Sequence, residues 1–196
     1  MTGAEEELEE LDDDSMHDSE LLPTRRPHPV IIAASLTARG GLLWLPVAGL
    51  LALAGRKTTA KRALTAAVVA MPLGHLISLV VHRRRPQAAA MPAREALPEH
   101  PDSSSFPSKH AVTAAAFGTA TALVDPGAAV FVTPLALLVA YSRLRTRVHW
   151  PTDVLGGLAI GALVALAQAG IGRSARARAT AWRLAAIVRP VFSDHS

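Results

Sequence analysis

Two long apolar runs without a formal charge constrain this chain most strongly. Residues 63–81 (ALTAAVVAMPLGHLISLVV) and residues 154–171 (VLGGLAIGALVALAQAGI) each lack Asp, Glu, Lys and Arg. Each is close to the roughly 20 residues that an α-helix needs to cross the hydrocarbon core of a bilayer. A soluble, Ala-rich helical bundle is the alternative, but two such runs are hard to bury in a chain of 196 residues. We therefore expect an integral membrane protein.

Further apolar segments extend this pattern to an all-α membrane helix bundle of about five spans. Residues 42–55 are short alone, and residues 30–40 form either an interfacial helix or the upper end of the same span. Residues 111–124 and 128–141 flank Asp-Pro-Gly at 125–127, a strong turn signal, and therefore predict a helical hairpin. Ala, Leu and Val supply most of the apolar content and only 4% of residues are aromatic, which favours helices over strands.

The charges divide the chain into three regions. Ten of the 16 acidic residues lie in residues 1–20, and all 20 Lys and Arg residues follow them. Residues 1–28 therefore form an acidic tail that we expect to be disordered, because its few apolar side chains cannot offset the entropy of ordering. Residues 29–172 form the predicted membrane-embedded domain. Residues 173–196 form a basic, amphipathic tail suited to a membrane surface.

The placement of the basic residues and the lack of cysteine narrow the possible partners. Lys and Arg lie at the ends of apolar runs, which is typical of membrane interfaces and phosphate sites, so we expect a bilayer and no nucleic acid as partner. The chain has no cysteine, which excludes disulfides and thiolate metal sites. The pattern predicts a multi-pass protein of the cell membrane and leaves its oligomeric state open.

Three charged or histidine-bearing segments fall at the same end of the predicted bundle. Because consecutive spans run in opposite directions, HRRRP (82–86), SFPSKHA (105–111) and SRLRTRVHWPTD (142–153) lie on one side. The turn at 125–127 and the basic loop at 56–62 lie on the other side. The three motifs therefore converge by topology alone, which predicts an active site at a membrane interface.

The residues of these segments suit phosphate chemistry. Ser108 is a candidate N-cap, and the first amides of the following helix would attract an anion. Asp153 follows His149 by four residues and could accept a hydrogen bond from one ring nitrogen, leaving the other outward as a base or nucleophile. Arg85 and Arg143 offer planar guanidinium groups that match phosphate oxygens.

Other interpretations of these residues exist. His110, His149 and Asp153 could bind zinc, although the two nearby arginines would repel the metal. The arginines at 83–85 could be a positive flank of a membrane span. His75 lies at membrane depth and is therefore a functional candidate, but we interpret it as a helix-packing residue.

The order RP, PSxH and SRxxxxxHxxxD resembles the phosphatidic acid phosphatase type 2 superfamily, which includes membrane lipid-phosphate phosphatases and vanadium haloperoxidases. The third motif is complete, with Ser142, Arg143, His149 and Asp153 at the family's spacing. The resemblance runs from about Ser78 to Asp153, with apolar segments on both sides. Length and composition resemble the small bacterial members, some of which act on polyprenyl-phosphate sugar phosphates.

The resemblance implies a lipid phosphatase that hydrolyses a polyprenyl-linked or glycerolipid phosphomonoester without a metal or other cofactor. In such an enzyme His149 attacks phosphorus to form a phosphohistidine, and Asp153 orients its ring. His110 protonates the departing alkoxide and then activates water. The groups that hold the phosphoryl oxygens are Arg85, Arg143 and Ser108, assisted by the backbone amides of Lys109 and His110.

Two positions depart from the family's pattern. The lysine that begins the first motif is Ser78 here, and the glycine of PSGH is Lys109. We hypothesise that the Lys109 ammonium or Arg83 supplies the charge that Ser78 lacks. The opposing interpretation is a catalytically silent member that binds anionic lipid or scaffolds a partner.

Overall fold

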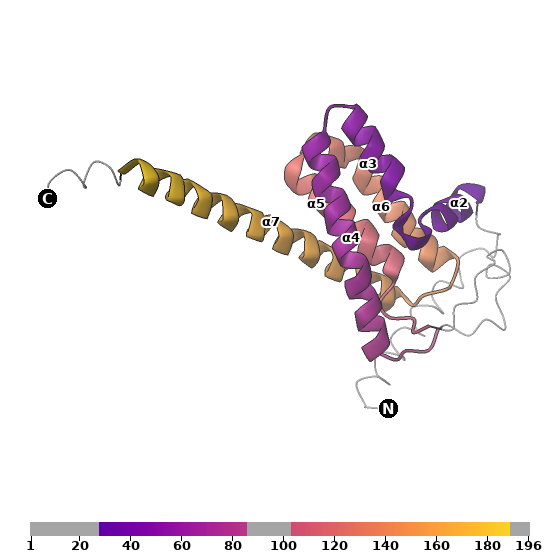
Figure 1. Ribbon diagram of the computed structural model, residues 1–196. Helices are drawn as coiled ribbons and strands as arrows, with labels where there is room; N and C mark the ends of the chain where they lie inside the picture. Colours follow the sequence, from indigo (N-terminus) through magenta and orange to yellow (C-terminus); the bar gives the residue numbers. More distant parts are fainter. Residues whose placement is uncertain (1–27, 86–102, 189–196) are drawn as a thin grey trace, which may run out of the picture.

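The computed structural model describes residues 28–85 and 103–188, and within these ranges it contains helices and no strands (Figure 1). The helices are α2 (Pro29–Thr37), the short 3₁₀ helix η1 (Arg39–Gly41), α3 (Trp44–Leu53), α4 (Lys57–Val80), α5 (Lys109–Val124), α6 (Pro126–Arg145) and α7 (Pro151–Val188). The predicted disorder of 1–28 concerns residues that, except for His28, lie outside the described ranges.

The all-α membrane bundle expected from the sequence is confirmed. In the described part, α4, α6 and residues 151–174 of α7 are long and apolar enough to cross a bilayer. Apolar side chains such as Leu76, Phe131 and Leu163 are exposed on these helices, as a lipid-facing surface requires. The helices α3 and α5 are shorter, and the 16 residues of α5 rise only about 24 Å, so the expected number of five spans is approximate.

The segment 30–40 forms a helix of its own. The helix α2 ends at Thr37, and the chain then turns at Gly40 and Gly41, whose φ values are 58° and 76°. A side chain at Gly41 would be strained at this φ, and its Cβ would also lie 2.9 Å from the Cε of Met71. The interfacial position of α2 stays a prediction, but its separation from α3 is a property of the fold.

The core is built from alanine around the central helix α5. This helix packs against α4, α6 and α7, and most of its side chains are buried. Because alanine side chains are short, the helix axes approach closely without large residues to fill the space between them. The bulkiest core contact is the stack of Trp44 on Phe117, with ring centroids 4.7 Å apart.

Two glycines of α7 lie directly against the backbone of α5. A Cβ at Gly161 would lie 2.1 Å from the carbonyl oxygen of Val112, and a Cβ at Gly157 would lie 2.8 Å from that of Ser108. Only glycine fits at either position. The GxxxG spacing of these two residues therefore brings the start of α7 against the start of α5.

Two further predictions from the sequence, the hairpin turn at 125–127 and the domain border at 172–173, can be compared with the structure. The hairpin turn is present, with Asp125 at the N-cap of α6 and its carboxylate paired with Arg56 from the α3–α4 loop. The helix α7 runs without a break past residue 172 and extends well beyond the other helices (Figure 1). The predicted domain border at 172–173 is therefore not a break in secondary structure, and the association of 173–196 with a membrane surface stays a prediction.

We predict that Gly161→Ala destabilises the protein by about 1–3 kcal/mol, because the added methyl group overlaps the α5 backbone. Thermal unfolding of the detergent-purified protein measures this effect as a lower Tm. The matched control is Gly170→Ala in the same helix, where a Cβ meets nothing within 4 Å. Equal Tm values for the two variants would contradict the close contact of α5 and α7.

Candidate active site

The structure brings the three charged segments together. Arg85 donates from Nη1 to the carbonyl oxygen of Val148 at 2.8 Å, which joins the first segment to the third. The ring of His149 donates to the carbonyl oxygen of Ser105 at 2.7 Å, which joins the third to the second. The Ser105 amide donates to the carbonyl oxygen of Arg83 at 3.0 Å. The convergence that topology predicts is therefore held by direct hydrogen bonds.

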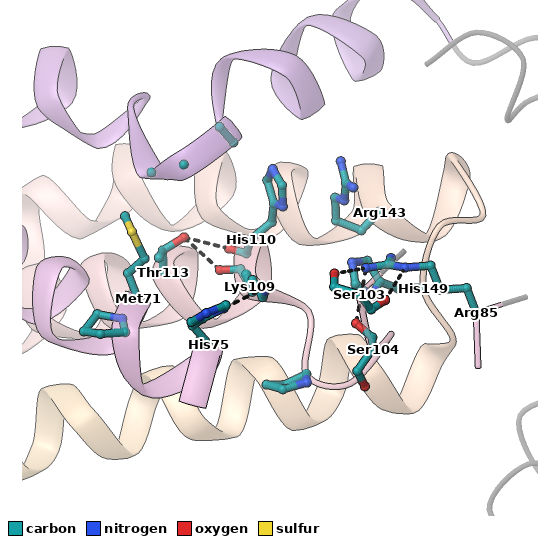
Figure 2. A pocket seen from close by; sticks show the side chains of 15 residues that line it. Met71, His75, Arg85, Ser103, Ser104, Lys109, His110, Thr113, Arg143 and His149 are labelled. Carbon is teal, nitrogen blue, oxygen red and sulfur yellow. Dashed lines mark hydrogen bonds between the residues drawn. The ribbon is translucent and has the colours of Figure 1, made fainter. Parts of the chain in front are cut away.

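A cavity of about 460 Å³ opens among these segments (Figure 2). Its basic and histidine side chains are His75, Arg85, Lys109, His110, Arg143 and His149. Ala38, Met71, Pro72 and Pro107 contribute apolar wall. Five of the seven predicted site residues therefore line one cavity, whereas Ser108 and Asp153 are buried behind it.

His149 is held by a backbone carbonyl rather than chiefly by a carboxylate. Its Nδ1 lies 2.7 Å from the Ser105 oxygen but 3.6 Å from Oδ2 of Asp153. A carbonyl oxygen only accepts, so Nδ1 carries the proton and Nε2 keeps its lone pair. The sequence predicts Asp153 as the residue that orients the ring, and its carboxylate does lie beside Nδ1; the Ser105 carbonyl, which the sequence did not suggest, makes the shorter contact with the same nitrogen.

Asp153 is fully buried and has its own partners. Oδ2 accepts from the Trp150 amide at 2.9 Å, and Oδ1 accepts from Nη1 of Arg83 at 3.1 Å. The same Nη1 donates to Oγ1 of Thr152 at 2.6 Å. Arg83, which the sequence suggested as a membrane flank or a replacement cation, is thus the ion-pair partner of Asp153. The proximity of 83 and 153 follows from topology, but sequence does not show which of three adjacent arginines turns inward.

The electrostatic environment of His149 favours the neutral imidazole. The side chain is only 4% exposed, and this burial lowers the pKa of His149 below its usual range. The positive charges of Arg143 and Arg85 act in the same direction, while Asp153 opposes them. The ring is therefore unprotonated on Nε2 at neutral pH.

The two predicted phosphate-binding arginines are both tied to the protein. Arg85 donates from Nε to the Ser103 carbonyl at 3.0 Å and from Nη2 to the Ser104 carbonyl at 3.2 Å, besides its bond to Val148. Arg143 is 2% exposed, and its Nη1 donates to the hydroxyl of Ser35 on α2. Ser35 was missed by the sequence analysis, because nothing in the pattern of α2 links it to a residue more than 100 positions away.

The start of α5 lies against the start of α7. Ser108 is the N-cap residue, as expected, but its side chain makes no capping hydrogen bond. Its amide donates to the carbonyl oxygen of Asp153 at 3.0 Å. Its hydroxyl is buried and has no hydrogen-bond partner among the described residues. Ser108 therefore connects the two helices and brings an uncommitted hydroxyl close to the site.

The two departures from the motif pattern lie on neighbouring helices. The hydroxyl of Ser78 donates to the carbonyl oxygen of His75 at 2.7 Å in its own helix, and Ser78 is not part of the cavity wall. Lys109 lines the cavity, with Nζ 3.3 Å from Nδ1 of His75. His75 is exposed to the cavity rather than packed between helices, so its interpretation as a packing residue is wrong. Of the two candidate replacement cations, Lys109 is the one that lines the cavity.

The described residues do not form a set of ligands for zinc, the alternative considered for His110, His149 and Asp153. Within 28–85 and 103–188, no three His, Cys, Asp or Glu side chains lie together in a way that could hold a metal ion. The buried carboxylate of Asp153 is instead engaged by Arg83 and by the Trp150 amide.

Comparisons with known proteins fit this geometry. A model of the PAP2 superfamily matches residues 59–174, which include all seven predicted site residues, Arg83 and His75 but not Ser35 or Ala38. The chain belongs to the PAP2 superfamily. The decaprenylphosphoryl-5-phosphoribose phosphatase of Mycobacterium tuberculosis is 38% identical over 155 residues, covering 75% of this chain and 82% of the relative. An undecaprenyl-diphosphatase of Sulfolobus acidocaldarius is 32% identical over 127 residues, covering 62% of this chain and 60% of the relative.

Two solved structures share the fold. The crystal structure of a transmembrane PAP2-type phosphatidylglycerolphosphate phosphatase from Bacillus subtilis matches with a TM-score of 0.66 and 25% identity, over 88% of each chain. Aquifex aeolicus LpxE matches with a TM-score of 0.57 and 23% identity, over 73% of this chain and 87% of the other, and supports the fold alone. The first likeness supports a transmembrane helix bundle of the PAP2 type, and the second supports the arrangement of the helices.

We predict that His149 is a neutral, Nδ1-protonated imidazole at pH 6.5 and titrates only below it, because burial opposes its charge. Histidine-selective ¹⁵N NMR in detergent micelles measures both the tautomer and the pKa, and His149→Ala identifies the signal among the eight histidines. An Nε2-protonated ring, or titration above pH 6.5, would contradict the geometry around Ser105.

Proposed function

We propose that this chain is a lipid phosphatase of the cell membrane that hydrolyses a phosphomonoester through a phosphohistidine intermediate. The observation that carries the proposal is His149, whose Nδ1–H is bound to the Ser105 carbonyl while the ring lines a cavity with Arg85 and Arg143. A histidine held in this way presents an unprotonated Nε2 to a bound phosphate. The fixed cations of the cavity stabilise the negative charge on the phosphoryl oxygens.

The proposed reaction has two displacements. In the first, Nε2 of His149 forms a bond to phosphorus, the bond from phosphorus to the ester oxygen breaks, and His110 gives its proton to the departing alkoxide. In the second, His110 takes a proton from a water molecule, the water oxygen attacks phosphorus, and the bond to Nε2 breaks to release inorganic phosphate. Asp153 stabilises the orientation and charge of the His149 ring from 3.6 Å.

The phosphoryl oxygens are held by groups from all three segments. Arg85 and Arg143 contribute guanidinium groups whose positions are fixed by carbonyl and hydroxyl partners. Ser108 contributes its buried hydroxyl, and the backbone amide of Lys109 lies in the first turn of α5, where amides lack acceptors within the helix. This set requires neither a metal ion nor another cofactor.

The substrate class is narrowed by the relatives and by the surroundings of the site. The M. tuberculosis relative is named for a decaprenyl-linked phosphoribose, and the S. acidocaldarius relative for undecaprenyl diphosphate. Apolar cavity wall at Met71 and Pro72 next to charged residues suits a headgroup at the bilayer surface. A polyprenyl-linked phosphomonoester therefore fits best, with a glycerolipid phosphate as the second class.

One observation favours a different function, a catalytically silent member that binds anionic lipid or scaffolds a partner. Arg85 donates to the carbonyls of Ser103, Ser104 and Val148, so much of its hydrogen-bonding capacity is used within the protein. In that case the cavity would bind a lipid phosphate without cleaving it.

We predict that the detergent-purified protein releases phosphate from polyprenyl-linked phosphomonoesters and retains this activity in EDTA. His149→Ala should lower kcat/KM at least about 10³-fold, because it removes the nucleophile. Phosphate release from a panel of lipid phosphates measures both results. Equal activity of the variant and the wild type would reject the phosphohistidine mechanism, and binding without release would establish the silent alternative.

We predict that Arg83→Gln lowers kcat at least about tenfold, although Arg83 does not line the cavity, because Asp153 loses its buried ion-pair partner and the loop around His149 shifts. The matched control is Arg84→Gln, which removes the same charge from the adjacent, exposed side chain. Steady-state kinetics of the two variants measure the difference. A kcat that falls equally in both would show that the effect is only one of net charge.

A further inference from the structure

His75 and Lys109 form a pair inside the cavity to which the proposed reaction assigns no side-chain role. Nζ of Lys109 lies 3.3 Å from Nδ1 of His75. An ammonium group only donates, so Nδ1 accepts and the proton of the neutral ring is on Nε2. Each ammonium has three hydrogens, and among the described residues His75 is the partner for one of them. The pair therefore holds a positive charge in place with capacity left for an anion.

The pair lies apart from the groups that surround the reacting phosphate. In the view of Figure 2, Arg85, His149 and Arg143 lie toward one end of the cavity and Met71 toward the other, with His75 and Lys109 between them. At the end where Met71 lies, this side chain contributes apolar wall, and Pro72 is a further apolar lining residue of the cavity. A substrate that follows this order has its phosphomonoester at one end, an anionic group in the middle and its lipid chain at the apolar end.

The charge of the cavity wall agrees with a second anionic group. The lining includes the cations Arg85, Lys109 and Arg143, and no Asp or Glu among the described residues. A phosphomonoester carries about 1.5 to 2 negative charges at pH 7, which leaves positive charge uncompensated. Cations that line one cavity repel one another, and bound anions relieve this repulsion. One additional phosphate on the substrate would neutralise the remaining positive charge.

We propose that the His75–Lys109 pair binds a second phosphate of the substrate, located between the lipid chain and the terminal phosphate that is released. The inference rests on the proposed phosphatase function and narrows its substrate class. The Lys109 ammonium binds the second phosphate directly, and His75 is a positioning residue that acts by holding the ammonium. The ligand chemistry is that of a lipid-linked phosphodiester that ends in a phosphomonoester, which leaves as an alkoxide, or of a lipid diphosphate, whose terminal anhydride bond breaks to leave the lipid monophosphate.

The test compares substrates that share one polyprenyl chain. Kinetics are measured with the monophosphate, the diphosphate and the phosphodiester-linked sugar phosphate, for the wild type and for Lys109→Met. We expect the ratio of kcat/KM between a two-phosphate substrate and the monophosphate to fall at least about tenfold in the variant, mainly through KM, because a charge-assisted hydrogen bond is lost. The two-phosphate substrate for which the ratio decreases identifies the distance between the two phosphates that the site accommodates.

The controls separate this inference from the function on which it rests. Lys61→Met removes an exposed lysine of α4 outside the cavity and should leave the ratio unchanged. His75→Ala should lower the ratio in the wild type but add little in the Lys109→Met background, because His75 acts through Lys109. His75→Gln, which keeps an acceptor, should restore part of the loss.

Two results would overturn the inference. An equal loss for all three substrates would show that Lys109 acts on the transferred phosphoryl group, in place of the lysine that Ser78 replaces. No loss for any substrate would show that the ammonium does not contact the substrate. If the wild type releases no phosphate, the proposed function fails, but the same ratio is then measured from dissociation constants of the lipids in micelles, so the second phosphate site is still tested.

Discussion

The contact between α5 and α7 at Gly157 and Gly161 is the constraint on which the site depends. With no side chain at these positions, the α7 backbone approaches that of α5 closely enough for the Ser108 amide to donate to the Asp153 carbonyl at 3.0 Å. That bond places the first turn of α5, with His110, beside the loop that carries His149. The arrangement of the candidate site is therefore a consequence of helix packing between small residues. The loops then fix the positions of individual side chains within it.

Fixed positive charge is the second feature that organises the site. Arg83, Arg85 and Arg143 are each bound to groups of the protein: a carboxylate, loop carbonyls and the Ser35 hydroxyl, respectively. Arginines with such partners lose little further freedom when a phosphate arrives, which is the preorganisation that charge stabilisation requires. Arg85 and Arg143 also help burial to lower the pKa of His149, so the two arginines that line the cavity serve both the proposed anion binding and the neutral state of the proposed nucleophile.

The sequence was sufficient to predict the topology and to identify the motif residues, but it did not predict which groups these residues form hydrogen bonds with. The uncharged runs and the Asp-Pro-Gly turn predict which ends of the helices meet, and the spacing from Arg143 to Asp153 identifies the third segment. The carbonyl of Ser105 could not be predicted as the partner of His149, because a backbone carbonyl carries no residue-specific signal. The roles of Arg83 and His75 depend on side-chain direction, which apolar periodicity does not encode.

The stereochemistry of the reaction at phosphorus is the most direct test of the central claim that His149 is transiently phosphorylated. Each in-line displacement inverts the configuration, so two successive displacements retain it overall. A polyprenyl phosphorothioate made chiral with oxygen isotopes, hydrolysed by the purified protein, should therefore yield thiophosphate with net retention. Net inversion would mean that water attacks the substrate directly, and His149 would then have to act as a base or an anion-binding residue instead.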